Sequence, residues 1–195
     1  MPGSLAELLH DWHDFYVLIG TASATLVGLM FVAASIGSTI FNEEHRAPMR
    51  AFITPTVVHF VSVLFTSLLV TIPTHGWHSL GGLLGAEGLA GSIYCGSILV
   101  QIILRHRFNV DLSDRVFYAL IPVLGYLLLL VSAVLFFMQS AASTNVIAAA
   151  LLTLLVAGVR NAWDMMVWIM IRAPSSGAAS PQPPPPAASS TEGRE

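Results

Sequence analysis

The sequence predicts an all-α integral membrane protein, a bundle of five transmembrane helices followed by a disordered tail. Of its 195 residues, 55% are hydrophobic and only 10% are charged, whereas a soluble domain carries about 25% charged residues. The mean hydropathy is +0.75. The chain also contains five apolar stretches close to the length of about 20 residues that a helix needs to cross a hydrocarbon core. These stretches are 15–41, 51–73, 80–104, 116–138 and 145–171.

The composition excludes several classes of function. Eight basic residues against eleven acidic residues give a net charge of −3, so the chain has no basic surplus for binding a nucleic-acid backbone. Cys95 is the single cysteine and cannot form a disulfide within the chain or a CxxC zinc or redox site. Nucleic-acid binding and zinc-finger architectures are therefore set aside.

Prolines mark boundaries in two of the predicted spans. The second stretch has Pro55 in its first turn, where a missing N–H costs little, and Pro73 at its end. The fourth stretch contains Pro122, which removes a backbone hydrogen bond and predicts a kink. The third and fifth stretches contain the intramembrane charged residues considered below.

The two ends of the chain differ in character. The first stretch, 15–41, has no charged residue and is too long for the apolar region of a cleavable signal peptide. We expect it to remain as an anchor within a membrane domain of residues 1–172. Residues 173–195 are rich in Ser, Ala and Pro, with four consecutive prolines at 183–186. This composition predicts a disordered or polyproline II tail.

The arginines predict the orientation of the chain in the membrane. There is no lysine, and seven of the eight arginines fall in the first or third predicted loop or after the fifth span. Under the positive-inside rule that side faces the cytoplasm, so the N-terminus is periplasmic and the C-terminus cytoplasmic. The preference for Arg over Lys and for Ala, Gly and Pro suggests a GC-rich bacterial genome, and hence a multi-pass protein of the inner (plasma) membrane. The seven arginines are Arg46, Arg50, Arg105, Arg107, Arg115, Arg172 and Arg194.

Small residues recur at four-residue spacing in the first and third predicted spans. Such residues let helix backbones approach closely in a membrane. We expect tight packing within the chain, with a homo-oligomer interface as the alternative. The residues are Gly20, Ala24 and Gly28, then Gly81 and Gly85, then Gly88, Ser92 and Gly96.

The fifth span carries the strongest polar constellation. Arg160 and Asp164 are four residues apart, on one face of a helix, so they can form an ion pair. Asn161 lies beside them. Because a charge at mid-membrane costs about 2.5–3.5 kcal/mol, such groups are expected to face the bundle and find partners there. The alternatives to a structural ion pair are a conduction or proton-relay role, and a span that ends near Arg160 and continues as an interfacial helix.

Two further ionisable residues lie inside predicted spans. Glu87 is expected about 10 Å below the outer surface, where it could hydrogen-bond to hydroxyls near Thr21 and Ser23 or bind a proton or cation. His59 lies past the middle of the second span, at the depth of Arg160 and Asp164. It is expected to be a hydrogen-bonded histidine between helices, with a relay member or a cofactor ligand as the alternatives.

The outer ends of the spans contain two HxxH patterns. Imidazoles at this spacing on a helix share a face and could bind Zn, Cu or Ni, with aspartates completing the coordination. A divalent metal site is therefore an alternative to ordinary interfacial polar residues. Its candidate ligands are His10, His13, His75, His78, Asp11 and Asp14.

The short loops and the missing catalytic motifs limit the functions that the sequence allows. The longest predicted loop has about ten residues, too few for a soluble domain, and P-loop, GxGxxG, GxSxG and HExxH motifs are missing from the sequence. We expect a non-enzymatic membrane protein, either an accessory or scaffold subunit or a proton-coupled permeation unit. Its surroundings would be the lipid bilayer, with a membrane protein partner or a second copy of the chain. The alternative is a metal-binding or haem/redox membrane protein that uses the outer histidines or His59.

Overall fold

The computed structural model describes residues 4–40, 43–104 and 120–172, and every regular element in these ranges is a helix. The predicted all-helical class is therefore confirmed. Several sequence predictions lie outside the described residues: the tail, the start of the fourth span, the third-loop arginines and Arg194. The helices are α1 (Leu5–Asp11), α2 (His13–Ile40), α3 (Glu43–Thr71), α4 (Trp77–Leu104), α6 (Ile121–Phe137) and α7 (Ala142–Arg172).

Four of these helices are long and apolar enough to cross a membrane. Their candidate spans are His13–Ile36, Thr54–Thr71, Trp77–Val100 and Ala142–Val167, and α6 is a shorter apolar helix. Pro122 lies in the first turn of α6, where its ring replaces an N–H that has no partner within the helix. The kink that the sequence predicts at Pro122 concerns the helical turn before this proline, which lies outside the described residues.

A short helix that the sequence analysis did not predict precedes the first span. In α1, the backbone N–H of Ser4 donates to Glu7 Oε2 at 2.9 Å and the N–H of Glu7 donates to Ser4 Oγ at 3.3 Å. This reciprocal pair is a capping box, which satisfies N–H groups that have no partner within the helix. Leu5 is buried, so α1 is tied to the end of the bundle.

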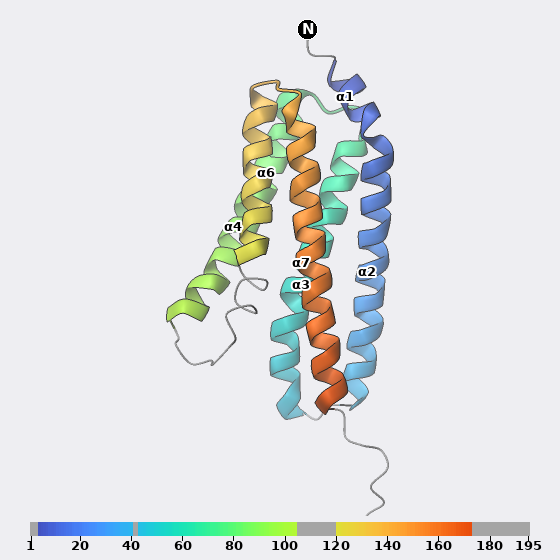
Figure 1. Cartoon of the computed structure of the whole chain (residues 1–195), viewed down its shortest axis with the longest axis vertical. Helices are drawn as coiled ribbons and strands as arrows, with labels where there is room; N and C mark the ends of the chain where they lie inside the picture. The colour runs from blue at the N-terminus through green and yellow to red at the C-terminus, as the bar shows by residue number, and fades with distance from the viewer. Residues whose placement is uncertain (1–3, 41–42, 105–119, 173–195) are drawn as a thin grey trace, which may run out of the picture.

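The helices form an antiparallel bundle (Figure 1). One end, which we call the α1 end, gathers α1, the α3–α4 turn and the α6–α7 turn; the other end holds the start of α3 and the end of α7. α6 packs between α4 and α7, and α3 packs between α2 and α7, whereas α3 and α4 make only a few contacts. The interior between α3, α4, α6 and α7 contains Val63, Leu84, Tyr126, Leu129 and Leu154.

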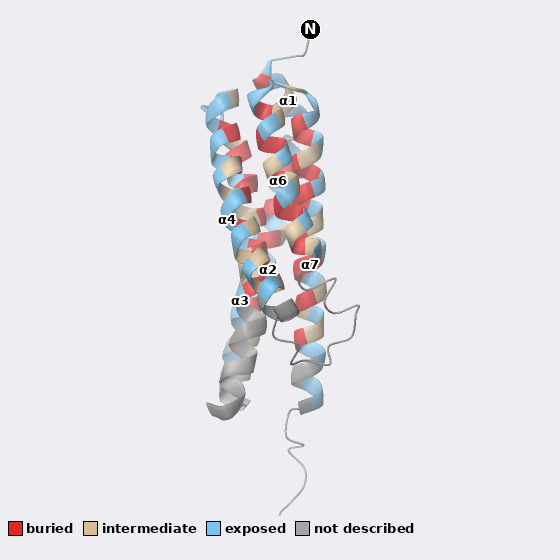
Figure 2. Ribbon diagram, turned by 90° about the vertical axis from the view of Figure 1, so that its left-hand side faces the viewer, coloured by how far each residue is buried: buried red, intermediate tan, exposed pale blue. Residues whose placement is uncertain are grey.

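Burial follows this arrangement. Buried residues lie on the faces of the helices that meet inside the bundle, and exposed residues lie outside (Figure 2). Many of the exposed side chains are large and apolar, including Leu18, Phe31, Leu89 and Val156. An outward apolar surface is what a helix bundle presents to lipid.

Glycines on α4 form the contact with α6. A Cβ atom at Gly81 would lie 3.1 Å from Phe136 Cβ, one at Gly85 would lie 3.4 Å from Ala133 Cβ, and one at Gly88 would lie 3.0 Å from the Leu130 backbone nitrogen. Tight packing within the chain is therefore confirmed for these three positions.

Of the other small residues, some pack on a neighbouring helix and some do not. Gly20 packs on Ser67 of α3, because a Cβ atom at Gly20 would lie 2.9 Å from Ser67 Cβ. A Cβ at Gly28 or Gly96 would meet nothing within 4 Å, and Ala24 is exposed. Packing within the bundle thus explains the pair Gly81 and Gly85, but only part of the other two small-residue patterns.

Candidate functional site

One face of α3 carries three polar side chains inside the candidate span. His59, Ser62 and Thr66 are spaced by three and four residues, which places them on one stripe of the helix. His59 and Thr66 are fully buried and Ser62 is half-buried. Because unpaired polar groups are costly in an apolar interior, the stripe needs partners on neighbouring helices.

These partners come from α4 and α6. Thr66 Oγ1 donates to Glu87 Oε2 at 2.8 Å. The hydroxyl groups of Ser62 and Tyr126 are 3.0 Å apart, and His59 Nδ1 lies 3.2 Å from the same Tyr126 oxygen. Ser62 also neighbours the Glu87 carboxyl group. We call these five residues the polar chain.

Tyr126 occupies the centre of the polar chain because Gly91 leaves room for its ring. A Cβ atom at position 91 would overlap the Tyr126 ring atoms. The ring also lies against the His59 imidazole, with centroids 5.8 Å apart. A glycine on α4 thus sets the position of a hydroxyl group that reaches α3.

The polar chain ends in two groups that can bind and release protons. In the part of the chain that the structure describes, Glu87 Oε1 and His59 Nε2 are buried and have no hydrogen-bond partner. The imidazole is thus linked through Tyr126 to Ser62, which neighbours the Glu87 carboxyl group, and the imidazole and the carboxyl group each keep one atom available. Such an arrangement is able to pass protons, since hydroxyl groups both donate and accept.

The partner of Glu87 differs from the predicted one. The Thr21 hydroxyl donates to the carbonyl oxygen of Val17 in its own helix at 2.8 Å, and the Ser23 hydroxyl donates to the carbonyl oxygen of Phe60 at 2.6 Å. The physical reason is which helices are neighbours. The first span, α2, packs on α3, whereas α4, which carries Glu87, packs on α6. The predicted contact between Glu87 and the first span is wrong.

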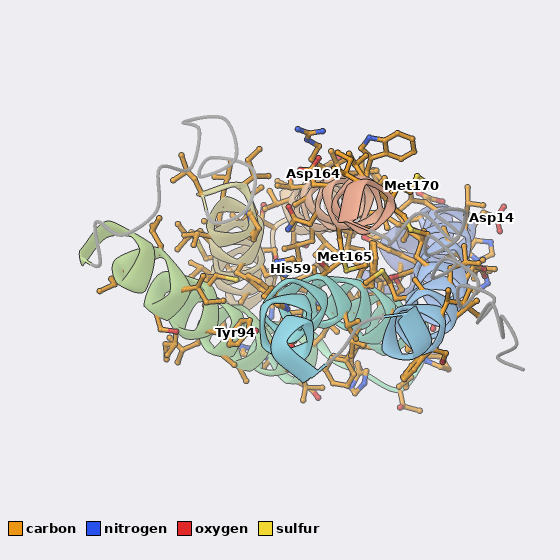
Figure 3. The ribbon with its side chains drawn as sticks, turned by 90° about the horizontal axis from the view of Figure 1, so that it is seen from below. Asp14, His59, Tyr94, Asp164, Met165 and Met170 are labelled. Carbon is orange, nitrogen blue, oxygen red and sulfur yellow. The ribbon has the colours of Figure 1, made fainter. Side chains whose placement is uncertain are left out.

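Arg160 and Asp164 form the predicted ion pair, with Arg160 Nη1 2.9 Å from Asp164 Oδ1. Their side chains are 41% and 42% exposed, and Asp164 points away from the bundle in Figure 3. The prediction that the pair faces the interior is wrong. Asn161 faces the interior instead and is 4% exposed, because adjacent residues on a helix point about 100° apart.

The level of this ion pair follows from a contact between α3 and α7. The Phe60 ring packs on Gly158, and the two helices are antiparallel, so Asp164 lies near the level of Thr54. The candidate span of α3 begins at Thr54. The pair thus lies within about one helical turn of the span boundary, where long charged side chains reach water. α7 continues as one helix past the pair to Arg172.

The outer histidines are not gathered into a metal site. Among the residues that the structure describes, no three His, Cys, Asp or Glu side chains lie close enough together to hold an ion. His10 lies in the last turn of α1 and His13 begins α2, with Trp12 between the two helices, so the first HxxH is not on one continuous helix. His75 Nδ1 lies 3.2 Å from Ser79 Oγ, and the His78 ring lies against Phe137.

Sequence reasoning missed the three hydroxyl residues of the polar chain. The spacing of Ser62 and Thr66 from His59 was a usable signal, because it repeats the helical period within an apolar span. Tyr126 offered only a weak signal, as a single hydroxyl group in an apolar run. Its role depends on which helices are neighbours.

Comparison with known protein families, with curated proteins and with solved structures gives no match to this chain. Its function is therefore inferred from its own residues and their geometry.

Proposed function

We propose that this protein is a proton-coupled membrane protein in which the polar chain passes protons between His59 and Glu87. The observation that supports this proposal is a set of polar side chains from three helices inside an apolar bundle. His59, Tyr126 and Ser62 are hydrogen-bonded in series, Thr66 is hydrogen-bonded to Glu87, and Ser62 neighbours the Glu87 carboxyl group. Polar groups inside a membrane are costly and commonly mark ion or proton pathways.

The proposed transfer uses only groups of the polar chain. In the tautomer with its proton on Nδ1, His59 accepts a proton at Nε2 and releases the Nδ1 proton to the Tyr126 oxygen. Tyr126 passes its own proton to Ser62, and Ser62 passes its proton to the Glu87 carboxylate. Each intermediate group ends with the number of protons it had at the start, and Glu87 becomes a carboxylic acid.

The polar chain covers part of the membrane thickness. Thr66 and His59 are seven residues apart on α3, which is about 10 Å at 1.5 Å per residue, against a hydrocarbon core about 30 Å thick. Thr66 lies nearer the α1 end, and His59 lies nearer the end at which α7 finishes. Protons would thus enter and leave through water at both ends of the polar chain.

The orientation that we propose follows the arginines. The α1 end would face the periplasm, and the end with Arg172 would face the cytoplasm of a bacterial inner membrane. The support is the placement of seven of eight arginines on one side of the predicted topology. Glu87 would then lie on the periplasmic half of the polar chain.

Proton flux in liposomes tests the proposed function. The purified full-length protein is reconstituted with a pH-sensitive dye inside, and a pH step is applied outside. We expect Glu87→Gln to lower the flux at least about tenfold, the result of raising a barrier by about 1.4 kcal/mol. Glu7→Gln is the matched control, because Glu7 is an exposed residue of α1. Equal flux in the wild type and Glu87→Gln would overturn the proposal and favour a role as an accessory subunit.

A further inference from the structure

Two buried polar side chains, His59 on α3 and Asn161 on α7, each carry one nitrogen atom that has no hydrogen-bond partner among the described residues. His59 is 0% exposed and Asn161 is 4% exposed. Within the described residues, His59 Nε2 and Asn161 Nδ2 have no hydrogen-bond partner. Buried amide and imidazole nitrogens are rarely left unsatisfied, since each costs about 1–3 kcal/mol.

The two side chains lie at the same level of the bundle. The Phe60 ring packs on Gly158, which fixes the relative height of the antiparallel helices α3 and α7. His59 precedes Phe60, and Asn161 follows Gly158 by three residues. Because helical side chains tilt toward the N-terminus of their own helix, His59 tilts away from the α1 end and Asn161 tilts toward it. The two side chains therefore converge.

Both side chains lie on helix faces that contact α6. His59 contacts α6 through the Tyr126 hydroxyl, and Figure 3 shows it on the side of α3 that faces α6 and α7. Asn161 follows Leu154 by seven residues, so both lie on one face of α7. Leu154 packs on Gly125 of α6, which is next to Tyr126. His59 thus lies on the face of α3 that contacts α6, and Asn161 lies on the face of α7 that packs on α6 about two turns nearer the α1 end.

The chemistry of the two nitrogens fits one kind of ligand. With its proton on Nδ1, His59 presents Nε2 as an acceptor, whereas Asn161 Nδ2 is only a donor. A water molecule accepts from one and donates to the other, as buried waters between polar groups do. We propose that His59 and Asn161 form a water-binding site through which protons reach the polar chain. The passage of protons rests on the proposed function, whereas the water site does not.

The proposed step balances without another reactant. A hydronium ion at the site gives one proton to His59 Nε2 and remains as water. The imidazole releases its Nδ1 proton to Tyr126 and keeps its total number of protons. Asn161 only orients the water molecule, so it is a positioning residue.

Hydroxyl-radical labelling tests the water site. X-ray radiolysis of the full-length protein in phospholipid nanodiscs produces radicals from water where it is bound, and mass spectrometry measures oxidation of each residue. We expect His59 to be oxidised faster than Phe136, which is also 0% exposed, with each rate normalised to the denatured protein. Asn161→Leu, which keeps the size of the side chain, is expected to slow His59 oxidation by about threefold or more, because it removes one of the polar partners that hold the water.

The control is the same substitution elsewhere on α7. Asn145 is exposed, so Asn145→Leu is expected to leave His59 oxidation unchanged. The water site would be overturned if His59 in the wild type were as unreactive as Phe136, or if Asn161→Leu did not change its rate. If Asn161→Leu unfolds the protein, Phe136 will be oxidised faster in that variant. The comparison of His59 with Phe136 in the wild type then still tests the water site. Glu87→Gln is expected to remove proton flux without changing His59 oxidation, so failure of the proposed function and failure of the water site are distinguishable.

Discussion

The ring of Tyr126 occupies the space that a side chain at position 91 would need. Gly91 on α4 therefore determines where the Tyr126 hydroxyl of α6 meets Ser62 and His59 of α3. The direct contacts between α3 and α4 are few, so much of the geometry of the polar chain depends on α6. A change on one helix is expected to act on the hydrogen bonds of another.

Gly91→Ala is expected to push the Tyr126 ring out of place. The added methyl group overlaps the ring, and overpacking of this kind costs about 1–3 kcal/mol. Denaturant unfolding in detergent micelles measures the loss. Gly82→Ala is the matched control on the same helix, because a Cβ there meets nothing within 4 Å. Equal stability of the two variants would contradict the packing argument.

Tyr126→Phe is expected to interrupt proton transfer while keeping the ring. The substitution removes the oxygen that lies near both Ser62 and His59, and the lost hydrogen bonds are expected to cost about 1 kcal/mol in stability. Tyr16→Phe is the control, because the Tyr16 hydroxyl donates to the Thr144 carbonyl oxygen at the α1 end, at 3.2 Å. Both variants should lose similar stability, but only Tyr126→Phe should lose flux. Unchanged flux in Tyr126→Phe would exclude Tyr126 from the transfer.

Glu87 is expected to react with a membrane-soluble carbodiimide. Such reagents modify the protonated form of a carboxyl group within the membrane, so the labelling rate should fall as the pH rises and the carboxyl loses its proton. Mass spectrometry of the adduct on the α4 peptide provides the measurement. Glu87→Gln should carry no adduct on this peptide. Asp14 should react little, because it is exposed in the first turn of α2, at the end of the candidate span and not inside the bundle. A labelling rate that did not change with pH would contradict this prediction.

The sequence predicted the helices better than it predicted their neighbours. Apolar runs identify spans because each residue contributes independently to membrane insertion. The partner of Glu87 could not be read in this way, because Thr21 and Thr66 lie on different helices and either could face α4. The choice depends on the packing of α4 against α6 through glycines, which is a property of the assembled bundle.

The same limit applies to side-chain direction. Helical spacing predicted that Arg160 and Asp164 pair, and they do. It could not decide whether their face or the face of Asn161 turns inward, because both faces carry polar residues in an apolar helix. α1 is a different case, since Ser4 and Glu7 form a capping-box pattern that sequence analysis can recognise.

Breaking the Arg160–Asp164 pair is expected to have a small effect. Both side chains are about 40% exposed, and exposed ion pairs contribute about 0.2–1 kcal/mol, whereas removing one partner of a buried pair costs about 3–5 kcal/mol. Asp164→Asn should therefore lower the free energy of unfolding by less than about 1 kcal/mol and leave proton flux unchanged. Unfolding in micelles and flux in liposomes provide the two measurements, with Arg160→Gln as the companion variant. A loss of several kcal/mol would mean that the pair is covered in the membrane by another protein or by a second copy of the chain. A loss of flux without a loss of stability would instead place Asp164 in the proton pathway.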